Sequence, residues 1–179
     1  MTPLLPVEIE TSRLRLRRPV LSDATAVFRS YAQDVQVCRY MIWLPHAAEA
    51  VTRSFILECA RAWDDGSRLP YVITPRGSDE AIGMIEARLQ GSTVDIGYVL
   101  ARALWGQGFM PKAIRALASA ALGRPGSFRV HATCDNENVA PQRALEKAGF
   151  LREGRLDRYT VHPNISSEPR ACLMYAKCR

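Results

Sequence analysis

One stretch of the chain decides the fold, and it reads Asp95-Ile96-Gly97-Tyr98-Val99-Leu100-Ala101-Arg102-Ala103-Leu104-Trp105-Gly106-Gln107-Gly108-Phe109-Met110-Pro111. Residues 93–100 have the pattern of a strand, and residues 111–122 form an alanine-rich segment that predicts a helix. Gly106 and Gly108 let backbone N–H groups turn toward a bound group, and the helix N-terminus adds partial positive charge. The stretch therefore predicts a phosphate or pyrophosphate cradle, with a tight turn that merely needs glycine as the alternative.

Two better-known phosphate motifs do not fit this stretch. A Walker loop needs a glycine followed by Lys-Ser or Lys-Thr, and the chain has none. A dinucleotide-binding fingerprint would need a third glycine where Pro111 stands. That fingerprint also opens the first strand–helix–strand unit of a parallel sheet, whereas three consecutive strands precede this loop. Both alternatives are disfavoured.

The segments on either side predict a mixed α/β (α+β) fold. Short turns join three expected strands into an antiparallel meander, at residues 69–74, 81–89 and 93–100. Before it the periodicity predicts a strand at 12–17, helices at 22–32 and 47–63, and a helical turn at 34–40. After it we expect helices at 111–122 and 141–148 and strands at 128–134, 151–162 and 171–177. No linker divides the chain, so residues 1–179 are predicted to form a single domain.

Composition excludes several classes of protein. The chain has 179 residues, of which 47% are hydrophobic and 23% charged, as in a globular protein. It has no apolar run near the roughly 18 residues of a membrane span, and the first residues lack the features of a signal peptide. Five cysteines without a Cys-x-x-Cys pair indicate reduced thiols, and the three histidines have no metal-ligand spacing. We therefore expect a cytoplasmic protein without a metal site.

Several short motifs in a fixed order resemble a known family. They are Glu10-Thr11-Ser12-Arg13-Leu14-Arg15-Leu16-Arg17, Met41-Ile42-Trp43-Leu44-Pro45, the stretch quoted above, Glu146-Lys147-Ala148-Gly149-Phe150 and Tyr175-Ala176-Lys177. Over about residues 8–178 the chain resembles the GNAT superfamily of N-acetyltransferases, in its RimJ/RimL-like branch. The resemblance implies a GNAT-like acyl-CoA N-acyltransferase fold. In that fold, helices flank a mixed, mostly antiparallel sheet that splays after residues 93–100, and acetyl-CoA sits in the gap.

The resemblance also implies which residues hold the cofactor. The strand backbone at Tyr98, Val99 and Leu100 would pair with the pantetheine arm. The pyrophosphate would rest on the loop Trp105, Gly106, Gln107, Gly108, Phe109 and Met110. Asn138 matches a cofactor contact at the start of a helix, and Arg143 lies one turn further on. Contacts of this kind rely on backbone amides and a helix dipole, so a phosphate-binding lysine is not required.

The chain departs from the family pattern at several positions. Met110 is bulkier than the usual glycine or alanine of the loop. Leu145 stands where many members carry a tyrosine acid, and Pro141 stands where the branch often has a serine. Ala171 replaces a common acidic residue before the last strand. These departures keep open the alternative of a catalytically impaired CoA-binding or interaction protein.

The mechanism implied is direct transfer, in which a neutral amine attacks the thioester. A carboxylate acting through water is a reasonable base, and Asp95 and Glu86 are the candidates. Tyr98 is the candidate proton donor, and a backbone N–H near Val99 the candidate oxyanion donor. For the carboxylates the alternative is a surface ion pair, and for the tyrosine it is core packing.

The acceptor is predicted to be a primary amine. It would be a protein N-terminus, such as that of a ribosomal protein, or a small molecule, with aminoglycosides and polyamines as alternatives. Trp43 and His46 lie in a loop that borders the acceptor site in the family.

The net charge of +6 comes entirely from residues after 100. It suits the phosphates of CoA, with Arg102, Lys112, Arg115 and Arg143 as candidate contacts. It suits nucleic acid less well, because no RNA-binding signature is present. A monomer or homodimer is expected.

Overall fold

The computed structural model describes residues 4–179. Residues 1–3, which belong to the N-terminal stretch without signal-peptide features, lie outside the described residues. One eight-stranded sheet runs through these residues, in the order β1-β2-β3-β4-β5-β6-β8-β7. Its strands are β1 (Glu8–Glu10), β2 (Leu14–Arg17), β3 (Leu69–Pro75), β4 (Gly83–Gln90), β5 (Thr93–Leu100), β6 (Arg129–Asp135), β7 (Leu151–Thr160) and β8 (Arg170–Cys178). This open, mixed sheet confirms the predicted fold class.

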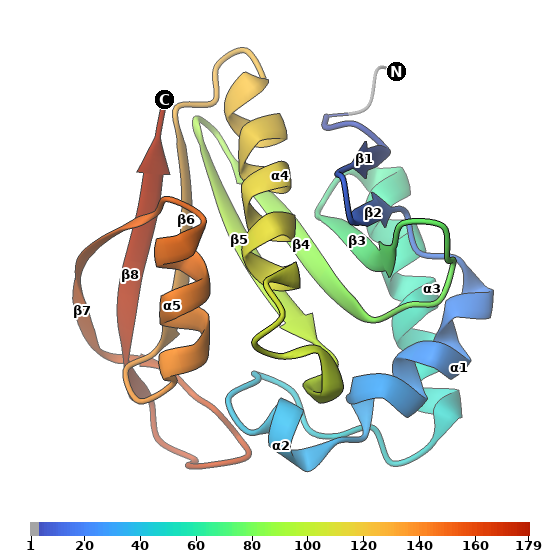
Figure 1. Cartoon of the computed structure of the whole chain (residues 1–179). Helices are drawn as coiled ribbons and strands as arrows, with labels where there is room; N and C mark the ends of the chain where they lie inside the picture. The colour runs from blue at the N-terminus through green and yellow to red at the C-terminus, as the bar shows by residue number, and fades with distance from the viewer. Residues whose placement is uncertain (1–3) are drawn as a thin grey trace.

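Helical elements connect the strands. A 3-10 turn η1 (Leu21–Asp23), α1 (Ala24–Val27), a π-helical turn η2 (Phe28–Ala32), α2 (Val35–Cys38) and α3 (Glu49–Asp65) separate β2 from β3. A 3-10 turn η3 (Arg102–Leu104) and α4 (Phe109–Gly123) follow β5, and α5 (Val139–Lys147) follows β6. Helices α4 and α5 lie on one face of the sheet, and α1 and α3 lie at the other (Figure 1).

The sheet splays between β5 and β6. These strands form the one parallel pair among the described residues, and they pair over only three rungs, from Thr93 opposite Arg129 to Asp95 opposite His131. Beyond Asp95 the two strands separate (Figure 1). The last rungs of β5 are therefore paired with β4 alone. The expected splay is confirmed, and it leaves one side of residues 96–100 without a partner strand.

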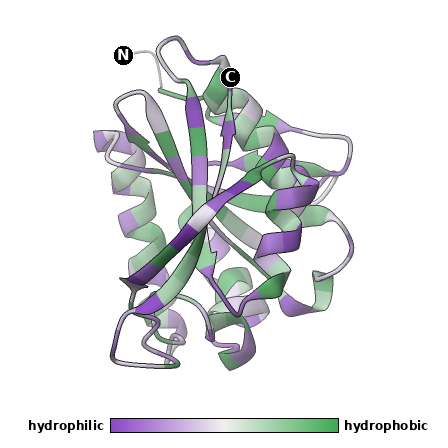
Figure 2. Cartoon of the chain, turned by 90° about the vertical axis from the view of Figure 1, so that its left-hand side faces the viewer, coloured by the Kyte–Doolittle hydropathy of each residue, from purple (hydrophilic) through white to green (hydrophobic). Residues whose placement is uncertain are grey.

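Two hydrophobic cores follow from the alternation of side chains along the strands. Ile85, Ile96 and Tyr98 pack toward Ile114 of α4 in the larger core. On the other face Met84 and Val99 pack with α1 and α3 in the smaller core. The outer strand β7, nearest the viewer in Figure 2, is mostly hydrophilic, as an edge strand with charged side chains is expected to be. No helix among the described residues is long and apolar enough to span a membrane.

The boundaries of two helices differ from the sequence prediction. Helix α4 begins at Phe109 rather than at 111, and α5 begins at Val139 rather than at 141. Each helix therefore carries its proline at the third helical position. Proline is tolerated there because the first N–H groups of a helix have no intrahelical partner. The short strand β1 was not predicted, and the helix expected at 22–32 is divided into η1, α1 and η2.

Candidate cofactor-binding site

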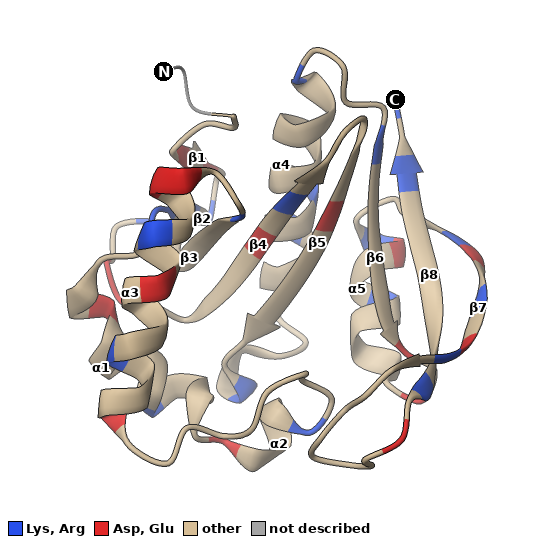
Figure 3. Cartoon of the chain, turned by 180° about the vertical axis from the view of Figure 1, so that it is seen from behind, with Lys and Arg blue, Asp and Glu red and all other residues tan. Residues whose placement is uncertain are grey.

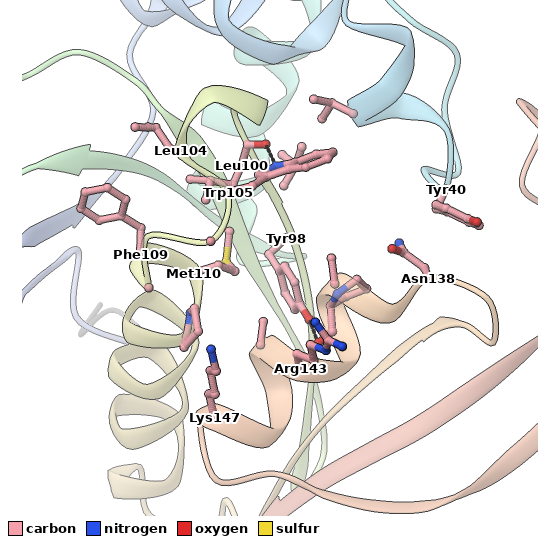
Figure 4. Close-up of a pocket in the computed structure, with 18 of the residues that line it drawn as sticks. Tyr40, Tyr98, Leu100, Leu104, Trp105, Phe109, Met110, Asn138, Arg143 and Lys147 are labelled. Carbon is pink, nitrogen blue, oxygen red and sulfur yellow. Dashed lines mark hydrogen bonds between the residues drawn. The ribbon is translucent and has the colours of Figure 1, made fainter.

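A cavity of about 510 Å³ opens where β5 and β6 separate. Four segments line it: residues 36–41 around α2, the end of β5, the loop into α4, and one face of α5 (Figure 4). Of the residues predicted to hold the cofactor, the cavity is lined by Tyr98, Val99, Leu100, Trp105, Gly106, Gly108, Phe109, Met110, Asn138 and Arg143. Gln107 is turned away, with its side-chain amide bound to the Ala103 carbonyl at 2.9 Å.

The backbone of β5 offers unpaired polar groups on the cavity side. The Ala101 N–H donates to the carbonyl of Ile82, the residue just before β4, at 2.8 Å. In an antiparallel ladder the direction of the backbone groups alternates, so Val99 also faces β4 while Tyr98 and Leu100 face the splay. The Leu100 carbonyl accepts a hydrogen bond from the Trp105 indole at 2.9 Å. A donor for an oxyanion is therefore better supplied by the N–H of Tyr98 or Leu100 than by that of Val99.

The loop before α4 presents a helix N-terminus to the cavity. Gly108 is the N-cap residue at φ 78°, and Gly106 has φ 76°, a region that favours glycine. The amides that follow Gly108 have no intrahelical partner and carry partial positive charge. Arg13 holds the loop from outside, because its guanidinium donates to the Gln107 carbonyl at 3.0 Å and lies 4.1 Å from the Phe109 ring centre. This geometry suits a phosphate group.

The charge of the cavity wall is wholly positive among the described residues. Arg39, Arg143 and Lys147 line it, and no Asp or Glu does. Of the four cations expected to contact CoA, only Arg143 lines the cavity. The other three bind elsewhere: Arg102 to the Asp34 carboxylate, Lys112 to the Ser12 hydroxyl and Arg115 to the Lys147 carbonyl. Lys147 follows Arg143 at helical spacing on one face of α5, a signal that sequence reasoning missed.

Tyr98 reaches across the splay to α5. Its hydroxyl donates to the Pro141 carbonyl at 3.2 Å (Figure 4). Burial raises the pKa of Tyr98 well above its usual value, so the phenol stays protonated at neutral pH. The hydroxyl thus lies beside the position where the family branch often has a serine. The sequence pattern alone did not predict that this hydrogen-bond donor contacts α5.

The two candidate bases lie outside the cavity lining. Glu86 and Asp95 occupy neighbouring strands on the face opposite α4, where Figure 3 shows charged bands on β4 and β5. Arg88 joins them, with its guanidinium 2.7 Å from Glu86 and 2.8 Å from Asp95. Arg68 bonds the other Glu86 oxygen at 2.8 Å. Glu86 lies opposite Gly97 in the splayed half, whereas Asp95 stands at the last rung shared with β6.

Trp43 and His46 lie beyond the cavity, next to its α2 wall. Trp43 packs with Phe55 and Val99 at the edge of the smaller core. The His46 ring lies 5.3 Å from the Trp43 ring and 5.9 Å from the Phe55 ring. Burial lowers the pKa of His46, whose Nδ1 is 2.7 Å from the Thr52 hydroxyl. These aromatic side chains form a wall on the α3 side of β5.

The thiol of Cys134 lies on β6, and this residue does not line the cavity. Burial raises the pKa of Cys134 to about 12, so its thiol is a poor nucleophile at neutral pH. Within residues 4–179 no group of three or more His, Cys, Asp or Glu side chains is placed to hold a metal ion.

The turn from β6 into α5 is built on a buried carboxylate, Asp135. Its side chain is fully buried and pairs with Arg170 at 2.6 Å. Burial alone would raise its pKa, but the bonds from Arg170 and from the Glu137 N–H outweigh burial and lower the pKa. Because the turn carries Asn138 into the cavity wall, the ion pair fixes one edge of the site.

Replacing Arg170 with Met is expected to lower the free energy of unfolding by about 3 kcal/mol near pH 7, since it leaves a buried charge unpaired. Asp135 has a lowered pKa when folded, so its contribution is present above the unfolded value of about 3.9 and is lost as pH falls below it. The difference between variant and wild type should therefore shrink below about pH 4. Urea unfolding from pH 3 to 7 measures it. Arg155→Met, in an exposed pair with Asp157, is the control and should change little; an equal loss in both variants would contradict the assignment.

The sequence comparison decides the family. The family model for the GNAT acetyltransferase domain matches residues 13–151. The chain belongs to the GNAT acetyltransferase family. This acetyltransferase is similar to the uncharacterized N-acetyltransferase p20 of Bacillus licheniformis, with 29% identity over 152 residues that cover 83% of this chain and 85% of p20.

Several solved structures share the fold of this acetyltransferase. The microcin C7 self-immunity acetyltransferase MccE, in complex with acetyl-CoA and AMP, has a TM-score of 0.86 at 20% identity over the whole of both chains. RimL, an α-N-protein acetyltransferase for ribosomal L7/L12 in complex with CoA, has a TM-score of 0.82 at 20% identity over 97% of each chain. At these identities the likeness concerns the fold. A RimL structure among the neighbours agrees with the predicted RimJ/RimL-like resemblance.

Proposed function

We propose that the protein transfers an acetyl group directly from acetyl-CoA to a primary amine in the cavity at the splay. The observation that carries this proposal is the combination of the N-terminus of the fifteen-residue helix α4, the two cations of α5 and unpaired strand amides around one opening. These groups fit an extended ligand that has phosphates at one end and amides along its arm. The neighbours MccE and RimL were crystallised with acetyl-CoA and CoA, which supports the same ligand here.

Each wall has a role in this proposal. The amides after Gly108 bind the pyrophosphate, and Arg143 and Lys147 neutralise phosphate charge from α5. The backbone groups of Tyr98 and the N–H of Leu100 pair with the pantetheine arm, so that the thioester carbonyl lies within reach of a strand N–H. Met110 is compatible with binding through backbone groups and a helix dipole, because it is buried and packs in the larger core.

In the reaction a C–N bond forms as the C–S bond breaks. The amine loses one proton, and the thiolate that leaves gains one from solvent. The Tyr98 hydroxyl turns its one hydrogen from the Pro141 carbonyl to the sulfur as negative charge develops there. Its raised pKa makes it a hydrogen-bond donor rather than a proton source, because a phenol less acidic than a thiol does not give up its proton to the thiolate. Positioning of the two reactants supplies most of the remaining rate enhancement over the uncatalysed reaction.

Glu86 is the carboxylate we assign as base, acting through water. It lies in the splayed half of the sheet, opposite Gly97, and each of its oxygens retains a lone pair beside its arginine bond. Asp95, the other candidate, is assigned the role of holding Arg88 from the far side.

Glu86→Gln is accordingly expected to lower kcat by roughly 100-fold, since a general base contributes about 10²–10⁴-fold. Asp95→Asn is the matched control on the neighbouring strand and should lower kcat much less. Initial rates with a saturating amine compare the two variants. If Asp95→Asn causes the large loss instead, the two roles are exchanged; if neither variant does, a carboxylate base is contradicted.

The proposal also concerns the chemical class of the amine acceptor. The favoured acceptor is a protein N-terminus or a small primary amine, since the RimL neighbour is an α-N-protein acetyltransferase. The aromatic wall of Trp43, His46 and Phe55 also suits an amine that carries a flat ring, and MccE was crystallised with AMP. Aminoglycosides and polyamines are further candidates, and a CoA-binding protein without catalysis is the alternative function.

A panel of acceptors tests the proposal. It contains a serine-initiated peptide, the same peptide with its N-terminus blocked, spermidine, an aminoglycoside, an amino-acid amide and an amine joined to AMP. Mass spectrometry after incubation with acetyl-CoA identifies every acetylated product. We expect acetylation of at least one free amine and none of the blocked peptide. Tight binding of acetyl-CoA without any acetylated amine would favour the CoA-binding protein instead.

A further inference from the structure

The loop between β7 and β8, residues 161–169, touches a distant part of the chain. Asn164 makes the hydrogen bonds: its amide nitrogen donates to the Cys38 carbonyl at 2.7 Å and to the Trp43 carbonyl at 2.8 Å. Both donor hydrogens of the amide are used in this way. The loop and α2 lie next to each other in Figures 1 and 3. We call residues 38–43 the α2 turn, because Asn164 holds its first and last carbonyls.

The α2 turn forms one wall of the cofactor cavity. Arg39, Tyr40 and Met41 lie between the two carbonyls that Asn164 holds, and all three line the cavity. Inside the turn the Met41 N–H donates to the Cys38 carbonyl at 2.9 Å. Packing contributes little on the outer side, because Ile42 is 69% exposed. The bond pair from Asn164 is therefore a main tertiary restraint on this wall.

The loop itself is held firmly at its base. His162 is buried, and its ring meets the Tyr40 ring edge-on at 6.4 Å. Its Nε2 lies 3.6 Å from Asp135, the carboxylate that organises the turn into α5. The N–H groups of Ile165 and Ser166 donate to the His162 carbonyl at 2.9 and 3.0 Å. Asn164 thus extends from a fixed block that also positions Asn138 on the opposite side of the cavity.

We propose that Asn164 is a positioning residue that fixes Tyr40 and Met41 against the α5 wall and so sets the approach of the amine to the thioester. The proposal rests on the proposed function of the cavity. The phosphate contacts come from α4 and α5, neither of which Asn164 touches. Loss of Asn164 should therefore impair the step that involves the amine much more than the binding of acetyl-CoA.

Two variants and a control test this proposal. Asn164→Asp keeps the shape but removes both donors, and Asn164→Leu removes them without adding charge. Ser166→Ala lies in the same loop and loses only a local bond, from the Glu168 N–H at 3.0 Å. Both Asn164 variants should lower kcat/KM for the amine by roughly 10- to 100-fold, as expected for a displaced wall, with the KM for acetyl-CoA nearly unchanged. Hydrogen exchange should rise in residues 38–46, and Ser166→Ala should match wild type.

Several outcomes would overturn the proposal. One is hydrogen exchange in residues 38–46 of the Asn164 variants that is as slow as in wild type. Another is faster exchange with unchanged amine kinetics. A third is a fall in kcat that matches the loss of folded protein, which would indicate a merely structural role. Should wild type acetylate no amine at all, the proposed function fails, yet the exchange experiment still decides whether Asn164 holds the α2 turn.

Discussion

Gly108→Asp is expected to weaken acetyl-CoA binding by roughly 30- to 150-fold. The new carboxylate would lie at the N-terminus of α4, where the pyrophosphate is proposed to bind. Repulsion between one negative charge and two others about 5 Å away amounts to about 2–3 kcal/mol at an effective dielectric constant of about 50, as in a largely hydrated site. Isothermal titration calorimetry with wild type and variant measures the effect directly.

The fold should survive this substitution. Asp and Asn adopt positive φ more readily than other side chains, which matters because Gly108 has φ 78°. A Cβ there would meet only the Arg13 guanidinium, at 4.0 Å. Gly108→Asn has the same shape without the charge and is the matched control, with affinity close to wild type. Equal loss in both variants would point to backbone strain, and no loss in the Asp variant would contradict the pyrophosphate site.

Tyr98→Phe is expected to lower kcat by roughly 10- to 100-fold, because a hydrogen bond to a charged group contributes about 1.5–3 kcal/mol. The hydroxyl next to Pro141 is the only part removed, and the ring still fills the splay. The KM for acetyl-CoA should therefore stay close to wild type. Steady-state kinetics with a saturating amine separates the two parameters.

Tyr175→Phe provides the control for this variant. Tyr175 is also a buried tyrosine, and its hydroxyl donates to Glu146 at 3.1 Å, away from the cavity lining. Its loss should leave kcat nearly unchanged. An unaltered kcat in Tyr98→Phe would contradict the role of the hydroxyl, and an equal fall in both variants would assign the effect to core packing.

The parts of the site that are local in sequence were predictable. Strand β5 lies at residues 93–100 as expected, because short turns bound it and its pattern is periodic. The two glycines before α4 predict a tight turn, and both Gly106 and Gly108 have positive φ. The predicted starts of α4 and α5 are two residues too late, because proline favours the first helical position whereas Pro111 and Pro141 occupy the third.

The parts that depend on long-range contacts were not predictable in the same way. The α2 turn accepts hydrogen bonds from Asn164, which is 126 residues away from Cys38 in the sequence. Arg102 looked free in the sequence, but folding brings Asp34 to within 2.9 Å of it. Side-chain partners of this kind are set by the path of the whole chain. Of the three cations that line the cavity in the described part of the chain, Arg143 and Lys147 follow residue 100 and Arg39 does not, and only Arg143 is among the predicted CoA contacts.

The most direct test of the central claim is the release of free thiol from acetyl-CoA by the purified protein, with and without primary amines. Direct transfer predicts that thiol release requires an acceptor amine and equals the amount of acetylated amine formed. Thiol release that is independent of every amine, or none with any amine in a folded protein that binds acetyl-CoA, would contradict it.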